Sequence, residues 1–261
     1  MSLLAEQRKK TIIDMIEHQG QVKVNDLAHA FDVSTETIRR YLEELEGEKK
    51  LKKVYGGAVK IETEIAEPPM FEREVIRSKE KKKIGSKAAE LIEEGNVIFI
   101  DEGSTTMHMV SSLVNISNIT VITNSFPLVT MLIDYQNKQV FSGEVIFLGG
   151  HVRSKHFRAS GSLAERVAKE FYVDKAFISI DGLHPEAGIT SFDLEKCLLS
   201  KIFIANANQT IVLADHSKLE VKANYKIDSL KHIDYILCTA SLPETWEIWT
   251  QAGLNVKNNK R

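Results

Sequence analysis

The sequence is poor in cysteine and proline, and it has no long hydrophobic run. Its 261 residues include two cysteines and five prolines. Cys197 and Cys238 each lie in an apolar stretch, which favours buried, reduced thiols over a disulfide and predicts a cytoplasmic protein. No apolar run approaches the ~18 residues of a membrane helix, and residues 1–10 lack the apolar core of a signal peptide. We therefore expect no disulfide scaffold and no association with a membrane.

Neither sign of charge dominates the chain. The net charge is −2 at pH 7, and 27% of residues are charged, as in an ordinary globular protein. Residues 1–60 hold eleven Lys and Arg against ten Asp and Glu, whereas residues 61–261 hold 23 against 26. A general basic coat for nucleic acid is thereby excluded. Any binding to DNA would depend on a few placed side chains and would be strengthened by dimerisation.

Residues 33–42, VSTETIRRYL, have the pattern of a helix that reads the DNA major groove. At 100° per residue, Ile38, Leu42 and Leu45 share one face, and polar side chains occupy the other. One face therefore packs into a core while the other is free to meet a ligand. An amphipathic helix with two arginines is also common on solvated surfaces, so its neighbours in the sequence must decide.

The polar face of this helix carries groups that suit a DNA duplex. Ser34 is placed to cap the helix, and hydroxyls and backbone N–H groups at its start can donate to phosphate oxygens. The arginines offer planar forks for guanine or for a second phosphate. The candidate DNA-binding residues of the helix are Ser34, Thr35, Thr37, Arg39 and Arg40.

The flanking segments complete a known DNA-binding arrangement. Helical spacing predicts helices over 4–16 and 24–31, although Lys23 is a weak N-cap for the second. Residues 51–54 and 58–61 flank a Tyr-Gly-Gly turn as in a β-hairpin, with the glycines at positive φ. Three helices followed by a basic hairpin form a winged helix-turn-helix. The hairpin adds three candidate DNA contacts, Lys53, Tyr55 and Gly56.

The length of the chain and a change in composition predict two domains. Residues 1–60 suffice for the winged helix-turn-helix, and the remainder is long enough for a second core. Residues 61–74 are acidic and contain Pro68 and Pro69, so we expect an extended connector with little helix. The second domain would then occupy residues 75–261.

Apolar, strand-like runs alternate with helical segments in this second domain. The predicted strands are 97–100, 119–122, 145–148, 176–180, 211–214 and 235–238. The predicted helices are 79–94, 105–114, 127–134, 163–171, 194–207 and 243–251. Strands that are apolar on both faces and alternate with helices indicate a largely parallel α/β sheet.

Polar residues follow the ends of five predicted strands, where open α/β sheets bind ligands. The Gly-Ser-Thr-Thr loop at 103–106 leads into a predicted helix, so its N–H groups and hydroxyls could hold a phosphate at the positive end of the helix dipole. Lys218 could neutralise that phosphate, and Asp101 and Asp181 could accept sugar hydroxyls. The same residue types also serve in capping and turns. The candidate effector-binding residues are Asp101, Gly103, Ser104, Thr105, Thr106, Asn124, Gly149, Asp181 and Lys218.

These motifs together resemble the DeoR-type bacterial transcriptional repressors. The likeness lies in VSTETIRRYL and LKKVYGGA, and then in DEGSTT at 101–106, TNS at 123–125, LGG at 148–150, IDGL at 180–183 and LADHSK at 213–218. The family usually has an acidic residue at Tyr41, arginine at Lys53, histidine at Tyr55 and serine at His216. The resemblance implies a C-terminal sensor domain of the ribose-5-phosphate isomerase type that binds a phosphorylated sugar or related metabolite. It raises Glu195 and Lys201, otherwise expected in solvent, only slightly as candidates.

The favoured hypothesis is a transcription factor that represses a carbohydrate operon. A homo-oligomer, dimer or tetramer, would place recognition helices in successive major grooves of operator DNA, and a phosphorylated sugar would release it. No cofactor, metal or catalytic residue is expected.

Two enzymatic alternatives remain open at this stage. A phosphosugar isomerase with a DNA-binding appendage would need a second carboxylate beside Asp181. At this position isomerases of this type have a motif similar to Asp-Gly-Ala-Asp-Glu. This chain has Asp181-Gly182-Leu183-His184-Pro185 instead. A sugar kinase that uses residues 101–105 as its phosphate loop would need ATP and Mg²⁺.

Overall fold

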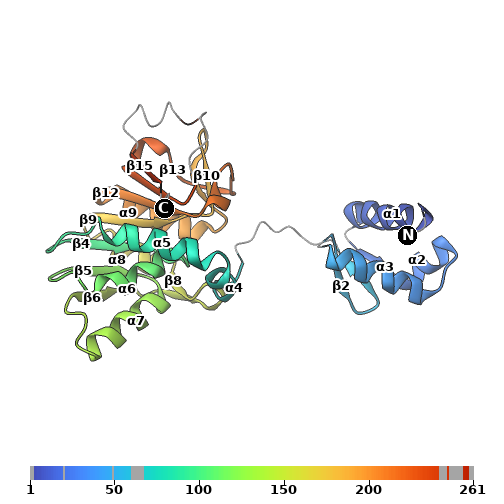
Figure 1. The fold of residues 1–261 in the computed structure, drawn as a ribbon, viewed down its shortest axis with the longest axis horizontal. Helices are drawn as coiled ribbons and strands as arrows, with labels where there is room; N and C mark the ends of the chain where they lie inside the picture. Colours follow the sequence, from blue (N-terminus) through green and yellow to red (C-terminus); the bar gives the residue numbers. More distant parts are fainter. Residues whose placement is uncertain are drawn as a thin grey trace. The chain divides into compact units, whose positions relative to one another are not determined.

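The computed structural model describes residues 3–19, 21–48, 50–59, 68–240 and 246 and the backbone of 255–258. The chain divides into two compact units, Met1–Ile65 and Ala66–Arg261 (Figure 1). In the described part of the chain, every helix is too short or too polar to cross a bilayer.

The first unit is a three-helix core with a small antiparallel sheet. Its helices are α1 (Leu3–Gln19), α2 (Val24–Phe31) and α3 (Thr35–Gly47), and its strands are β1 (Gln21–Lys23), β2 (Lys52–Val54) and β3 (Gly57–Val59), in the order β1-β3-β2. Ile38, Leu42 and Leu45 of α3 are buried against Ile12 and Leu27. The predicted winged helix-turn-helix is confirmed. Strand β1 was not predicted, since three residues are too few to show alternation.

The hairpin turn fastens the wing to the start of α2. Lys23 provides no side-chain cap, but the backbone N–H of Val24 donates to Gly56 O at 2.9 Å and so satisfies the first free donor of α2. Gly56 has φ of 81°. A Cβ on Gly57 would lie 2.0 Å from Val22 O. The glycines therefore permit both the turn and the close approach of β3 to β1.

The prediction of an extended connector over 61–74 is wrong for its second part. Residues 60–67 lie outside the described residues. Pro69 precedes a helix, α4 (Met70–Val75), which buries Met70 and Arg73, because proline tolerates the first turn of a helix, where no N–H partner is required. Helix α5 (Ser78–Ala89) follows after Arg77. Both helices belong to the second unit, whose boundary lies at Ala66 rather than at residue 75.

The second unit is built on a seven-stranded sheet in which every neighbouring pair of strands is parallel. Its order is β15-β14-β12-β9-β4-β5-β6. The strands are β4 (Val97–Ile100), β5 (Thr120–Thr123), β6 (Glu144–Phe147), β9 (Val173–Ser179), β12 (Ala207–Ala214), β14 (Tyr235–Cys238) and β15 (Asn255–Asn258). Six of these strands match predicted runs, and the parallel α/β fold is confirmed.

Helices cover both faces of this sheet (Figure 1). Phe99 of β4 packs with α8 (Ser162–Ala168) and α9 (Leu194–Ala205) in one apolar cluster. Its neighbours Ile98 and Ile100 pack with α5, α6 (Val110–Leu113) and α7 (Phe126–Asn137) in another. Because successive strand residues point to opposite faces, a strand covered on both sides must be apolar throughout.

Short elements complete the unit, and none of their strands was predicted. They are the antiparallel strands β10 (Gly182–His184), β11 (Gly188–Ser191) and β13 (Tyr225–Asp228), the hairpin β7 (His151–Arg153) and β8 (Arg158–Ser160), and the 3-10 turns η1 (Thr106–Met109), η2 (Ser154–His156), η3 (His216–Lys218) and η4 (Leu230–His232). The predicted helix 105–114 is in fact η1 followed by the four residues of α6. The predicted helix 243–251 lies outside the described residues except Trp246.

The order of the strands creates a crevice between β4 and β9. After β4 the chain adds β5 and β6 on one side, then returns to β9 and adds β12, β14 and β15 on the other. The connections after β4 and β9 therefore leave the sheet in opposite directions. A doubly wound sheet binds its ligands at this switch point, beyond the carboxyl ends of the strands.

Candidate functional site

The polar face of α3 is open to solvent. Ser34 Oγ accepts a hydrogen bond from the Thr37 backbone N–H at 3.2 Å and so caps the helix as expected; Thr35 and Thr37 are half-buried. The side chains of Arg39 and Arg40 are 61% and 67% exposed, and each lies within 4.0 Å of a glutamate on the same helix. Exposed pairs of this kind contribute little. Both guanidinium groups are therefore available to another partner.

The residues of the wing differ in their freedom. Tyr55 lies at the hairpin tip and is fully exposed. Lys53 Nζ lies 2.8 Å from Glu43 Oε1, and the backbone N–H of Lys53 donates to Glu46 Oε1 at 2.8 Å. The hydrogen bond from Lys53 holds the pKa of Glu43 below its ordinary value. Lys53 thus joins the wing to α3, whereas Tyr55 extends from it.

A cavity of about 120 Å³ opens at the switch point of the second unit. Its walls come from the loops after β4, β9 and β12, from α9, and from residues 68–81. Five predicted effector-binding residues line it, namely Gly103, Ser104, Thr105, Asp181 and Lys218. The fold therefore brings together side chains that are more than a hundred positions apart in the sequence.

Four predicted effector-binding residues do not line this cavity. Asp101 is buried, and its Oδ2 accepts from Ser200 Oγ at 3.2 Å. Thr106 is fully buried and donates to Asp101 O at 2.7 Å, which holds the loop in shape. Asn124 donates to a backbone carbonyl of β8 at 3.0 Å, and Gly149 is not among the lining residues. Asp101, Thr106 and Asn124 thus have structural partners within the protein.

The loop after β4 is shaped by a close approach to β9. A Cβ on Gly103 would lie 2.6 Å from the Cβ of Ser179, so only glycine lets the two strand ends meet here. The loop enters the 3-10 turn η1 instead of a regular helix. The expected contribution of a helix dipole to phosphate binding is therefore small, because aligned turns are what create it. Charge at this site has to come from side chains.

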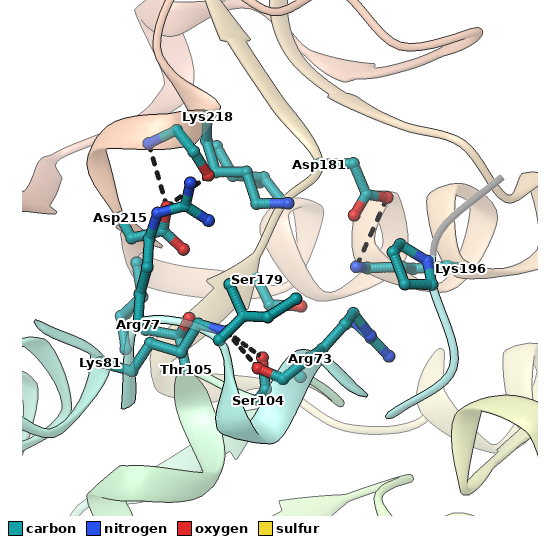
Figure 2. A pocket seen from close by; sticks show the side chains of 16 residues that line it. Arg73, Arg77, Lys81, Ser104, Thr105, Ser179, Asp181, Lys196, Asp215 and Lys218 are labelled. Atoms are coloured by element: carbon teal, nitrogen blue, oxygen red, sulfur yellow. Dashed lines mark hydrogen bonds and ion pairs between the residues drawn. The ribbon is translucent and has the colours of Figure 1, made fainter. Parts of the chain in front are cut away.

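Three cationic side chains lie at one end of the cavity, around Asp215 (Figure 2). Arg77 Nε lies 3.9 Å from Asp215 Oδ1. Lys81 Nζ donates to Ser104 Oγ at 2.9 Å. Burial lowers the pKa of Lys81 to about 8, helped by the neighbouring cations and opposed by Asp215. Lys218 completes the group, which offers positive charge to an anion.

A buried ion pair lies at the other end of the cavity (Figure 2). Lys196 Nζ is 3.7 Å from Asp181 Oδ2, and both side chains are almost fully buried. Burial alone would raise the pKa of Asp181, but Lys196 and Lys218 bring it to about 2. Asp181 also accepts from Ser191 Oγ at 2.9 Å. This end therefore presents a fixed carboxylate and a fixed ammonium group, the groups needed to bind hydroxyls.

A buried charge network supports this end from behind. Arg158 is fully buried between Glu102 Oε1 and Asp193 Oδ1, each at 2.7 Å. Lys196 lies 3.8 Å from the same Glu102 oxygen. Burial would raise the pKa of Glu102, yet the surrounding cations lower it. Hairpin β7–β8 is thereby joined to α9 and to the loop after β4.

Several residues that line the cavity were not among the candidate effector-binding residues, chiefly Arg73, Arg77, Lys81, Lys196 and Asp215. Arg73 lies in α4, part of which was assigned to the connector, Arg77 lies at the junction between α4 and α5, and Lys81 lies in α5. On α9 the family resemblance favoured Glu195 and Lys201 slightly, but Glu195 pairs with Arg153 and Lys201 is exposed. The inward position is Lys196. A lysine on the apolar side of a predicted helix was the signal available for it.

Both units match known protein families. Residues 8–64 match the DeoR-like helix-turn-helix domain and residues 76–239 match the DeoR C terminal sensor domain. The chain is 34% identical to the HTH-type transcriptional regulator YulB of Bacillus subtilis, over 92% of this chain and 91% of that protein. It is 36% identical to FruR of the same organism, over 83% and 84%, and 28% identical to the Escherichia coli glycerol-3-phosphate regulon repressor, over 91% and 92%.

Part of the chain also matches a solved structure of ribose 5-phosphate isomerase A from Methanocaldococcus jannaschii. The identity is 23% over 53% of each chain, and the TM-score is 0.38. The two family matches carry the assignment instead, since the sensor family alone spans more than half of the chain. The protein belongs to the DeoR family of DNA-binding transcriptional regulators.

Proposed function

We propose that the protein represses a carbohydrate operon and that a phosphorylated sugar, bound in the cavity of the second unit, releases it from operator DNA. Helix α3 and the wing would contact the duplex, as their exposed arginines and Tyr55 allow. The glycerol-3-phosphate regulon repressor of Escherichia coli, among the relatives, supports an effector of this class.

The observation that carries this proposal is the division of the cavity into two ends. Arg77, Lys81 and Lys218 gather at one end, and the Asp181–Lys196 pair lies at the other. A phosphorylated sugar has the same division, with a dianion at one end and hydroxyls at the other. The described lining contains no aromatic side chain on which a nucleobase could stack. A sugar phosphate therefore suits the cavity better than the ATP that a kinase would need.

We also propose that the ligand is bound without turnover. An isomerase needs a carboxylate that can take a proton from carbon. The pKa of Asp181 is about 2, and its ion pair with Lys196 makes it a weak base. His184 stands where isomerases of this type usually have an aspartate. Its Nδ1 instead accepts hydrogen bonds from backbone N–H groups of its own turn. Incubation with ribose 5-phosphate should yield no ribulose 5-phosphate above the uncatalysed rate.

Thermal unfolding with a panel of phosphorylated sugars tests the effector class. A selective ligand at 100 times its Kd should stabilise the protein by about 2.7 kcal/mol. The corresponding free sugars should stabilise it far less. Lys218→Ala should lose most of this shift, whereas Lys222→Ala, an exposed neighbour outside the cavity, should keep it. A panel in which free sugars stabilise the protein as strongly as their phosphates would contradict the proposal.

A further inference from the structure

The cavity is covered by residues that directly follow the segment 60–67. Helix α4 turns Met70 and Arg73 inward, whereas Phe71 and Val75 are 64% and 77% exposed. A helix of six residues that leaves such side chains in solvent gains little stability from apolar burial. Its attachment to the unit therefore depends mainly on its polar contacts.

Those polar contacts are made by residues that line the cavity. Arg73 O accepts a hydrogen bond from Lys81 Nζ at 2.5 Å, and the same Nζ donates to Ser104 Oγ. The guanidinium of Arg73 lies 3.6 Å from Glu102. Figure 2 shows Lys81 reaching from α5 to both partners. Lys81 thus links α4, α5 and the loop after β4 at one point.

The junction between α4 and α5 also faces the cavity. Arg77 has φ of 56° and ψ of 32°, the left-handed region that a residue with a Cβ seldom adopts. Its guanidinium extends to Asp215 beside Lys218 (Figure 2). The residue that sets the angle between the two helices is therefore also a cavity cation.

The lining of this end of the cavity carries more positive than negative charge. Arg77, Lys81 and Lys218 surround one carboxylate, Asp215. Lys81 uses two of its three N–H donors on protein oxygens, which leaves a third for a ligand. A dianion placed here would attract all three cations, of which two belong to residues 70–81.

We propose that residues 70–81, which we call the strap, close on the phosphoryl group of the effector and so determine how firmly α4 is attached to the second unit. This inference rests on the proposed function and adds to it that the charge of the ligand, rather than its sugar, acts on the strap. A ligand can shift the strap only through contacts that one state has and the other lacks. Contacts from Arg77 and Lys81 to the phosphoryl group exist only when the strap is closed.

Hydrogen exchange of the 261-residue chain, with both units present, tests the strap. The probes are inorganic phosphate, ribose 5-phosphate and glycerol 3-phosphate, with ribose and glycerol as neutral counterparts and sodium chloride to hold the ionic strength. The phosphate-bearing probes should slow exchange of the amides of residues 70–81 by at least about fivefold, the lower end of usual coupling between sites. The neutral probes should leave these amides unchanged.

Matched variants separate the strap from a general effect. Lys81→Gln should remove the response of residues 70–81. Lys82→Gln changes an exposed lysine on the same helix, and this variant should retain the response of residues 70–81. Arg77→Gln, which leaves Lys81 in place, should reduce the protection of the strap more than it reduces affinity for ribose 5-phosphate. Arg77→Gln decides the question if Lys81→Gln does not fold.

Each result has one meaning. If a phosphate-bearing probe stabilises the protein but leaves exchange of residues 70–81 unchanged, the strap is refuted and the proposed function stands. If ribose or glycerol protects residues 70–81 as strongly as the phosphate-bearing probes do, the strap does not respond to the charge of the ligand and the inference is refuted. If neither the three phosphate-bearing probes nor the wider panel of sugar phosphates stabilises the protein, the inference and the proposed function fail together.

Discussion

Burial separates lysines and arginines of equal charge into different roles. Lys81 and Lys196 are buried and bonded at the cavity, whereas Lys82, next to Lys81, and Lys201, five positions after Lys196, are exposed. Arg158 is fully buried in a network of carboxylates. A buried cation must be paired, so its position specifies the groups around it. The charge itself is visible in the sequence, but the partner is not.

The lowered pKa of Lys81 predicts a pH dependence of ligand binding. Burial places this pKa at about 8, and an anion beside the ammonium group favours its charged form. Affinity for ribose 5-phosphate should therefore be greatest below pH 8 and should fall as the pH rises through 8, by up to about tenfold per pH unit. The phosphate is already a dianion over this range, since its second pKa is about 6.

Calorimetry with ribose 5-phosphate between pH 7 and pH 9.5 measures this dependence. Lys82→Gln is the control and should show the same fall, because Lys82 is exposed and outside the cavity. An affinity that stays constant across this range would show that Lys81 does not contact the anion.

Among elements, those with a helical period or a continuous apolar run were predictable, and the shortest ones were not. Strand β4 occupies the predicted residues 97–100, and β14 the predicted residues 235–238. Strands β7, β8 and β10 have three residues each, which is too few for a period to appear. Helix α4 was hidden by the two prolines before it. The cavity takes Arg73 from α4 and Arg77 from the junction after it, so its outline could not be predicted even where its loops were.

Gly103→Ala tests the approach of the loop after β4 to β9. The added Cβ would lie 2.6 Å from Ser179 Cβ, so the loop and the end of β9, both of which line the cavity, have to move apart. We expect a loss of stability of about 1–3 kcal/mol and loss of stabilisation by ribose 5-phosphate or by the sugar phosphate that the panel selects. Thermal unfolding with and without ligand measures both.

Gly149→Ala is the matched control. A Cβ at Gly149 meets nothing within 4 Å, and the residue is absent from the cavity lining. Stability and ligand shift should both stay near those of the unmodified protein. A Gly103→Ala variant that keeps the full ligand shift would contradict the assigned role of the loop.

The whole molecule combines a small unit that matches the DeoR-like helix-turn-helix domain with a larger unit that matches the sensor domain. Residues 1–60 carry little net charge, so one copy has little general attraction for DNA. Two associated copies would contact two half-sites, and binding of the first would raise the effective concentration of the second at its half-site. We therefore propose a homo-oligomer as the DNA-binding form, with two recognition helices engaged at once.

A footprint on operator DNA tests this arrangement. Two protected half-sites should have centres about 10–10.5 base pairs apart or a multiple of that distance, because both helices must enter the major groove on a related face. Addition of the effector should abolish protection of both half-sites at the same time. Sedimentation of the free protein provides the matching measurement, and a single protected half-site bound by a monomer would contradict the proposal.

Local pattern was enough to establish the winged helix-turn-helix, the parallel sheet and the loops that reach the cavity, because periodicity and turn residues act over a few positions. Folding alone decided which side chains meet. It turned Lys196 inward, left Asp101 and Thr106 with partners inside the protein, and brought Arg77 and Lys81 over the cavity. These outcomes depend on contacts between distant segments, and such contacts leave no local period in a sequence.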